Sequence, residues 1–346
     1  MGPMLPGRQR RFRSLAVRLA PLALGLALVL GAPGYLPDQF YLRVATFICF
    51  YGVLALGWNL IGGYADQLSL GHAVFFAIGA YATALLQVDL GLTPWVGVVL
   101  ATALGGLSAL AFGLLTFRWS GTYFTLATLA LLEIGGICAT YFRSVTRGSS
   151  GISIPILRDS PAMMQFDSPL PYYYLAAAML LGSLLVSWLV LTSKLGYRLR
   201  AIRANREAAQ LAGVNLFRSK LAALVISASL VAAAGGFYAE YIQFIDPDST
   251  FSLQLAVNMA LFAIVGGVST WWGPALGAAI MVPITQYTSM QLTGRLAPLG
   301  EVGLGLILIT VILLRPQGVA PALAAFWTAV SRRFVERSVP DARGVG

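Results

Sequence analysis

Charged residues are scarce in this chain, and their scarcity is the first guide to its class. Only 10% of the 346 residues are Asp, Glu, Lys or Arg, whereas 58% are hydrophobic. Soluble globular domains carry charge on about a quarter of their residues, so this composition argues against a soluble fold. Long apolar runs of about twenty residues are typical of membrane-spanning helices. The composition therefore predicts an all-α, polytopic integral membrane protein.

Histidine and cysteine are also nearly absent, which limits the possible chemistry. The chain has one histidine, His72, and two cysteines, Cys49 and Cys138. These three residues cannot build a four-ligand metal site, and we expect both cysteines to be small buried hydrophobic residues. No acid or nucleophile lies near His72 in the sequence, so we expect a packed or pore-lining histidine. We predict no catalytic residue, no metal and no enzyme activity.

A phosphate-binding loop of the form G-x-x-x-x-G-K-[ST] is missing as well. The chain therefore does not bind ATP by that device, and we expect no cofactor of its own. A net charge of +10 is compatible with a polyanionic partner, but the basic residues fall in three clusters beside apolar runs, at 8–18, 194–220 and 315–343. Membrane topology explains this pattern better than nucleic acid does.

Ten apolar segments are candidate spans or re-entrant helices: 15–31, 41–61, 67–88, 95–117, 122–142, 172–192, 219–242, 252–267, 273–290 and 299–314. The first follows four arginines and resembles a signal sequence. Residues 31–34 form a poor cleavage site, however, so a retained span is favoured. A full crossing needs about twenty apolar residues. The short segments 252–267 and 273–290 could therefore instead form a re-entrant pair buried in protein.

The loop at 194–220 fixes the predicted orientation. It holds seven basic residues and one acid, Glu207, and short loops with such an excess of Lys and Arg stay in the cytoplasm. An even number of crossings must then precede it, which requires 67–88 to be a span. Both termini, with basic tails at 1–14 and 315–346, are expected in the cytoplasm. Loops 143–171 and 243–251 are expected outside, where 143–171 is either a contact for an external partner or a plain connection.

The amino-acid sequence of the central loop, residues 194–220, indicates a contact with another protein. Its apolar and basic residues recur at helical steps, which predicts one short helix that ends before Gly213 and Asn215. Glu207-Ala208-Ala209, followed by Gly213, resembles the EAA loop by which ABC permeases dock on their ATPase. Small alanines allow close approach, and glycine lets the chain turn back. The predicted ATPase-coupling residues are Arg203, Glu207, Ala208, Ala209 and Gly213. The alternative is a juxtamembrane helix whose arginines only face anionic lipid.

Polar residues inside the predicted spans are candidates for a translocation path, because such residues are costly at membrane depth. They are Asn59, Gln67, Ser69, His72, Thr125, Thr128, Glu133, Asn258 and Gln286. Glu133 is the strongest candidate, since a carboxylate at that depth must face a cavity or a partner. For any single one of them, a hydrogen bond that ties two helices is the competing explanation.

Glycines interrupt two pairs of apolar segments. Gly62-Gly63 precedes Gly71 in the first half of the chain, and Gly266-Gly267 precedes Gly273-Pro274 in the second. Such paired interruptions are typical of broken helices around a site in the middle of the membrane. The alternative is that glycine only permits close helix packing.

Several stretches in order complete the pattern: NLIGGYADQLSLGHAVFFAIGAYATALL, GTYFTLATLALLEI, TRGSSGI, GYRLRAIRANREAAQLAGVNLFRSKLAALVISA, GGVSTWWGPALGAA and LLRPQGV. From Asn59 to Val319 the chain resembles the LivM-type permeases of branched-chain amino acid ABC importers. The resemblance implies one permease domain over residues 1–346 in a bacterial inner membrane. It also implies a heterodimer with a LivH-type permease, two cytoplasmic ATPases that bind the ATP, and a periplasmic substrate-binding protein.

The expected substrates are Leu, Ile and Val, because apolar side chains suit an apolar lining. Similar permeases are associated with urea and short amides, so these remain alternatives. A secondary transporter is the rival class, in which Glu133 or His72 would carry the coupling ion.

Overall fold

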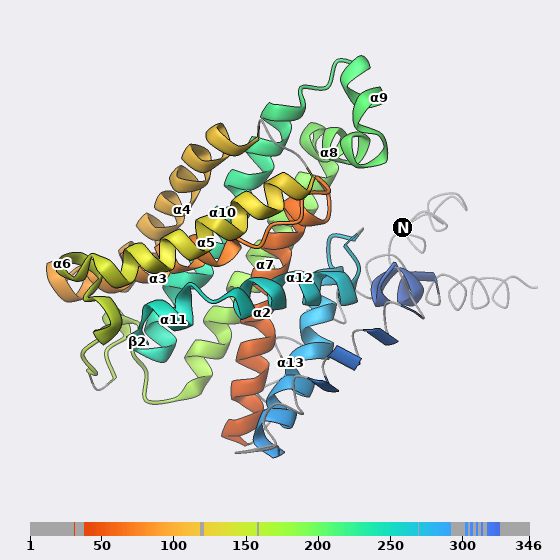
Figure 1. The fold of residues 1–346 in the computed structure, drawn as a ribbon. Helices are drawn as coiled ribbons and strands as arrows, with labels where there is room; N and C mark the ends of the chain where they lie inside the picture. The colour runs from red at the N-terminus through yellow and green to blue at the C-terminus, as the bar shows by residue number, and fades with distance from the viewer. Residues whose placement is uncertain are drawn as a thin grey trace, which may run out of the picture.

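The computed structural model describes residues 38–117, 121–157, 159–268 and 270–291, together with residue 31 and the short pieces 302–303, 305–306, 309–310, 313 and 317–325. These parts are mostly helical (Figure 1). Among them, the strands β1 (Ile152–Ser153) and β2 (Phe244–Ile245) form a two-stranded sheet. The predicted all-α class is confirmed.

Among the described residues, eight long helices form the bundle: α2 (Gln39–Gly62), α3 (His72–Leu90), α4 (Pro94–Thr116), α5 (Thr122–Tyr141), α7 (Pro169–Thr192), α10 (Leu216–Ile242), α12 (Leu253–Gly266) and α13 (Gly273–Gln291). Seven stretches in the described part of the chain are long and apolar enough to cross a membrane, with Pro247–Gly266 as one of them and α13 not included. The predicted number of ten stays a prediction, because 15–31 and most of 299–314 lie outside the described residues.

Local sequence sets where these helices begin. Asp38 caps α2 by accepting a hydrogen bond from the Phe40 amide, as expected for aspartate at a helix N-terminus. The helix expected from residue 67 begins at His72 instead, because the preceding segment follows an irregular path in which Asp66 has a φ of 53°. The Leu70 amide in that segment donates to the Thr128 hydroxyl at 3.0 Å rather than to a helical carbonyl.

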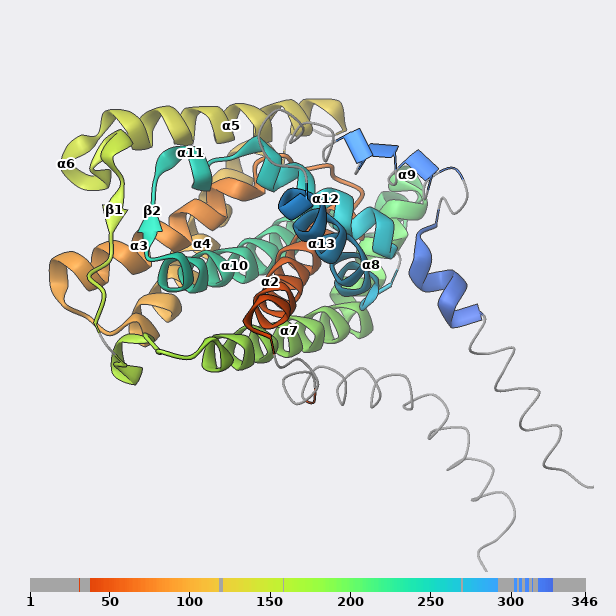
Figure 2. The same cartoon turned by 90° about the horizontal axis from the view of Figure 1, so that it is seen from below.

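The centre of the bundle is formed by α2 and α10. Helix α2 packs against α7, α10, α12 and α13, and α10 packs against α3 and α4 (Figure 2). Small residues make the closest approaches possible: a Cβ on Gly79 would lie 2.0 Å from the Ala232 carbonyl oxygen, and one on Gly277 would lie 1.8 Å from that of Phe262. Small residues at such contacts are the usual means by which membrane helices pack. For the glycines of α12 and α13, close packing is therefore a sufficient explanation.

The connections gather at two opposite ends of the molecule (Figures 1 and 2). One end carries α8 (Lys194–Ala204) and α9 (Arg206–Leu211). The other carries α6 (Arg143–Thr146), the 3-10 turns at Gly148–Ser150 and Pro161–Met163, both strands and α11 (Pro247–Thr250). Ile152 of β1 pairs with Ile245 of β2. Loops 143–171 and 243–251 thus share one end, as the predicted parity requires.

Two expectations need correction. The single helix predicted in the central loop is two helices, because Asn205 is extended and its side chain caps α9 by accepting from the Ala208 amide. Cys138 is exposed, whereas Cys49 is buried as expected. Its exposure follows from the position of α5 at the edge of the bundle, where it buries little of its surface in this chain.

Candidate functional site

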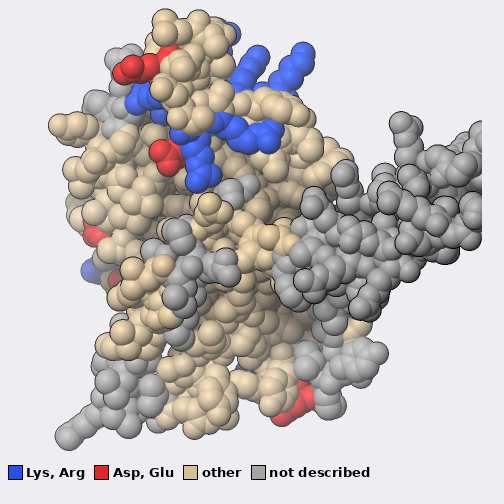
Figure 3. Space-filling model, turned by 90° about the vertical axis from the view of Figure 1, so that its right-hand side faces the viewer, with Lys and Arg blue, Asp and Glu red and all other residues tan. Residues whose placement is uncertain are grey.

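The end of the molecule that carries α8 and α9 is strongly basic. Leu199 and Ile202 of α8 are buried, whereas its arginines are exposed. Figure 3 shows these basic side chains gathered over this end. An amphipathic helix with one basic face suits the boundary between a membrane and a partner or a lipid surface.

The residues predicted to couple to an ATPase divide into two groups. Arg203, Glu207, Ala208 and Gly213 are exposed. Ala209 is only 4% exposed, so its side chain packs inside the chain and does not reach the surface. Gly213 has a φ of +81°, the left-handed conformation that favours glycine, and it begins the turn back toward α10.

Leu211, at the end of α9, was not predicted as a contact residue. It is 90% exposed, which makes it the most exposed large hydrophobic residue in the described part of the chain. Its apolar side chain in a basic loop was the available signal in the sequence. Single exposed leucines are common, but this one lies beside Glu207 and Ala208 on the same short helix.

Arg200 of α8 contacts its own helix and α7, and the charges of α8 act on the segment between α2 and α3. Arg200 lies over the Tyr197 ring, 4.6 Å from its centroid, and donates to the Leu191 carbonyl at 3.3 Å. The charges of Arg200 and Arg203 also act on Tyr64, which is 1% exposed. Burial is the main effect and raises the pKa of Tyr64, and the two arginines act in the opposite direction. The α8 arginines therefore lie close to the irregular segment that precedes α3.

His72 is a fully buried junction between three helices. Its Nδ1 lies 2.7 Å from the Ser69 hydroxyl, and its Nε2 lies 2.7 Å from the Ser227 hydroxyl. Ser227 in turn donates to the Gly57 carbonyl at 2.6 Å. With its proton used there, Ser227 accepts from Nε2–H, and in the neutral imidazole Nδ1 then accepts from the Ser69 hydroxyl. These hydrogen bonds link α2, α3 and α10 through the imidazole.

Four other predicted path residues lie around the segment that connects α2 to α3. Asn59 donates to the Thr270 carbonyl at 3.4 Å, which brings the two glycine-containing breaks together. Thr125 donates to the Leu68 carbonyl at 2.9 Å, and buried Thr128 accepts from the Leu70 amide. Gln67 is 6% exposed and donates to the Asp66 carbonyl. With Ser69 and His72, these side chains hold the segment before α3 in place.

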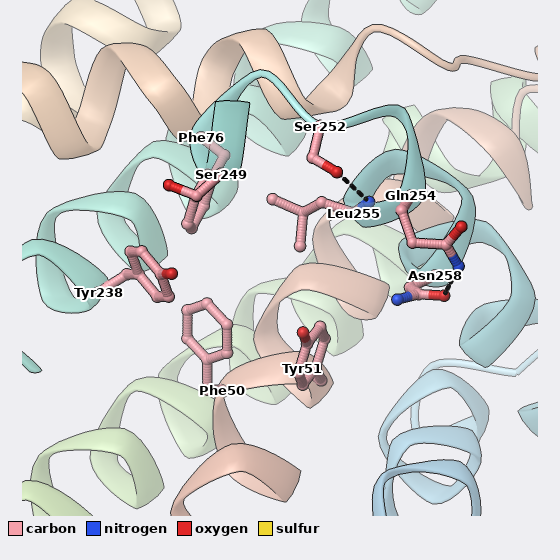
Figure 4. Close-up of a pocket in the computed structure, with 9 residues that line it drawn as sticks. All are labelled: Phe50, Tyr51, Phe76, Tyr238, Ser249, Ser252, Gln254, Leu255 and Asn258. Atoms are coloured by element: carbon pink, nitrogen blue, oxygen red, sulfur yellow. Dashed lines mark hydrogen bonds between the residues drawn. The ribbon is translucent and has the colours of Figure 1, made fainter. Parts of the chain in front are cut away.

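Two cavities adjoin the start of α12. We call the smaller one, of about 170 Å³, the aromatic cavity; it is lined by Phe50, Tyr51, Phe76, Tyr238, Ser249, Ser252, Gln254, Leu255 and Asn258 (Figure 4). We call the larger one, of about 900 Å³, the α5 groove; its lining includes Leu132, Glu133, Gly136, Ile137, Arg143, Asp248, Phe251, Ser252 and Gln254. Ser252 and Gln254 belong to both, so the two spaces are neighbours.

The remaining predicted path residues are on or near these spaces. Glu133 is exposed and lines the α5 groove. Asn258 lines the aromatic cavity, where it accepts a hydrogen bond from the Gln254 amide at 3.1 Å. Gln286 is half-buried on α13 and lines neither cavity.

The sequence prediction missed one buried polar pair. Glu240 of α10 is 0% exposed, and the Gln87 amide of α3, oriented to donate, lies 2.5 Å from its carboxyl oxygen. The signal in the sequence was an acidic residue inside the predicted span 219–242. The pair ties α3 to α10 at the end opposite to His72.

A bundle of apolar helices with a polar groove at its edge and one basic end defines a polytopic membrane transport protein. Comparison with known families makes the class specific. The family model described as branched-chain amino acid transport system / permease component matches residues 40–314, and the chain belongs to this family.

Individual relatives are also named as permease proteins. The chain is 28% identical over 301 residues to the high-affinity branched-chain amino acid transport system permease protein LivM of Salmonella typhimurium, covering 80% of this chain and 69% of LivM. It is 28% identical to the guanosine ABC transporter permease protein NupQ of Bacillus subtilis, covering 69% and 79%. It is 22% identical to LivH of Salmonella typhimurium, covering 78% and 90%. No solved structure matches the chain.

Proposed function

We propose that this chain is the permease subunit of a bacterial ABC importer that carries branched-chain amino acids across the inner membrane. The family match and the similarity to LivM and LivH support this function. In this proposal, α8 and α9 dock on a separate ATPase subunit. The importer contains two such subunits, and they bind the ATP. The chain supplies the path and no chemistry of its own.

The observation that carries the proposal is the exposed tip of α9. Leu211, Glu207 and Ala208 form a small surface with one apolar side chain, one carboxylate and one methyl group. Such a surface allows close packing and one directional contact. Anionic lipid alone would suit the arginines, whereas an exposed leucine beside a carboxylate and a small alanine suits a protein contact. We assign Arg198 to the lipid side and the α9 tip to the ATPase.

Charge supports the orientation. The end with α8 and α9 holds seven basic residues and one acid between Lys194 and Lys220, which supports a cytoplasmic position for this end and for both termini. The opposite end, with loops 143–171 and 243–251, then faces the periplasm. This end is the proposed contact for a substrate-binding protein.

We place the second permease against α5. The outward faces of α4 and α7 are apolar, with exposed Val99, Leu107, Leu185 and Leu189, and they suit lipid. The outward face of α5 carries Glu133, which is costly against hydrocarbon. A similar chain, LivH, is a separate permease protein of its system. Two similar chains can pair around a pseudo-twofold axis, and the α5 groove would then become part of a closed path.

Alternatives exist both to the proposed substrate and to the proposed energy source. Relatives named for guanosine and arabinose indicate that the family is not restricted to amino acids, and urea or short amides remain possible cargo. An ion-coupled mechanism would need a titrating group on the path. His72 is a poor candidate, because its two ring nitrogens are occupied by Ser69 and Ser227.

Reconstituted vesicles containing the full complex test the proposal. We expect ATP-dependent uptake of leucine that persists when ionophores collapse the proton and sodium gradients. Uptake that stops on collapse, while ATP hydrolysis continues, would contradict the ABC mechanism. Uptake of urea in place of leucine would contradict the proposed substrate but not the proposed ABC mechanism.

A further inference from the structure

We propose that the aromatic cavity is a subsite that receives the apolar side chain of the amino acid as it passes through the permease. This inference rests on the function proposed above. It adds a specific place in this chain where the substrate is held and the residues that hold it.

The apolar wall of the cavity is a cluster of rings from three helices (Figure 4). Phe50 of α2 stacks on Tyr238 of α10 with centroids 5.7 Å apart, and Phe76 of α3 meets Tyr238 edge to face at 5.2 Å. Tyr51 is held by Phe262 at 5.4 Å. Rings that lock one another in this way form a fixed surface, and burial of aliphatic groups against it is favourable.

The opposite wall is polar and comes from the start of α12. Ser252, Gln254 and Asn258 line this side. The Gln254 amide donates to the Asn258 oxygen at 3.1 Å, and Figure 4 shows the Asn258 nitrogen turned toward the cavity. A donor at the edge of an apolar cavity is suited to a carboxylate or carbonyl oxygen. The two walls thus match a molecule that is apolar at one end and polar at the other.

Size narrows the ligand further. The cavity volume of about 170 Å³ is close to that of a roughly 150 Å³ apolar cavity that binds one benzene molecule. A leucine, isoleucine or valine side chain with its α-carbon is of that size. A purine nucleoside is too large to enter whole.

The position of the cavity fits a point on the route. Phe50 and Tyr51 lie in the middle of α2, whereas Ser249 belongs to α11 at the end of the bundle opposite to α8 and α9, so the cavity extends from the middle of α2 toward that end. Ser252 and Gln254 also line the α5 groove, which contains the ionisable Glu133 and Arg143. A zwitterion in the groove therefore lies next to the aromatic cavity, with only the segment at Ser252 and Gln254 between the two spaces.

Photo-leucine, a leucine analogue with a diazirine in its side chain, tests this subsite in the reconstituted complex during ATP turnover. We expect crosslinks on α2, α10 and α12, at or beside Tyr51, Tyr238 and Asn258, and excess leucine should suppress them. Crosslinks confined to other segments would overturn the inference. A wild-type complex that takes up neither leucine nor photo-leucine would instead overturn the proposed function.

A pair of variants on α12 gives a second readout. Asn258→Phe fills the cavity, and we expect leucine uptake per assembled complex to fall about tenfold or more. Val257→Phe adds the same ring at a neighbouring residue that lines neither cavity; uptake by this control should stay within about twofold of wild type. Equal uptake by both variants, with crosslinks absent from the cavity, would refute the subsite.

Discussion

His72 Nε2 lies 2.7 Å from Ser227 Oγ, so a side-chain hydrogen bond ties α3 to α10 inside the core. The Ser227 hydroxyl in turn donates a hydrogen bond to the Gly57 carbonyl of α2. The single histidine of the chain therefore has a mechanical role in this structure, and the three helices that meet here are fixed relative to one another.

Ser227→Ala should destabilise the protein by about 1–3 kcal/mol, because it leaves His72 Nε2–H buried without a partner. Thermal unfolding of the purified complex measures this loss. Ser229→Ala, on the same helix, should cost less, because no hydrogen bond of the Ser229 hydroxyl is found among the described residues. Unchanged stability with lost transport would instead place Ser227 on the path.

The sequence was sufficient for the fold class and for most helix limits, because apolar runs and capping residues such as Asp38 and Asn215 act locally. It could not predict which face of a helix is buried. Ala209 and Cys138 were both misplaced for that reason: Ala209 packs inside its own chain, and Cys138 faces outward. The Gln87–Glu240 pair also depends on two helices far apart in sequence.

The substitution Glu133→Gln tests whether Glu133 belongs to the translocation path or has only a structural role. Removing the charge also removes an insertion cost of roughly 2.5–3.5 kcal/mol, so we expect at least as much protein in the membrane and a clear loss of leucine uptake per complex. Uptake and immunoblots of the same vesicles check this. If uptake per complex is unchanged, the α5 groove is not part of the path.

Cys138 reports on the α5 face. It is exposed in the single chain, whereas Cys49 is buried, so a membrane-permeant maleimide should modify Cys138 in the isolated subunit. We expect protection once the second permease is co-expressed, because α5 then lies in the interface. Mass spectrometry quantifies the modification. Equal modification with and without the partner would move the interface away from α5.

Topology follows from the two ends of the bundle. In a Cys138→Ala background, a cysteine at Ser150 should react with an impermeant thiol reagent added outside intact cells, and a cysteine at Arg198 should react only after permeabilisation. Both residues are exposed, so accessibility in the fold does not limit the reaction. Reaction of both from the same side would contradict the predicted orientation.

The docking role of the α9 tip is the central claim, and Leu211→Asp tests it most directly. Leu211 is 90% exposed, so the change costs the fold little, whereas Ala209→Arg would disturb a buried position. An unpaired charge in an interface typically costs about 2–5 kcal/mol. Arg198→Ala, on the lipid-facing side of α8, is the matched control.

The decisive measurement is co-purification of the ATPase together with substrate-stimulated ATP hydrolysis in one preparation. We predict that Leu211→Asp loses both while the chain still inserts and still pairs with the second permease, and that Arg198→Ala retains both. Co-purification and hydrolysis equal to wild type in Leu211→Asp would contradict the docking role and leave α8 and α9 as a lipid-surface element.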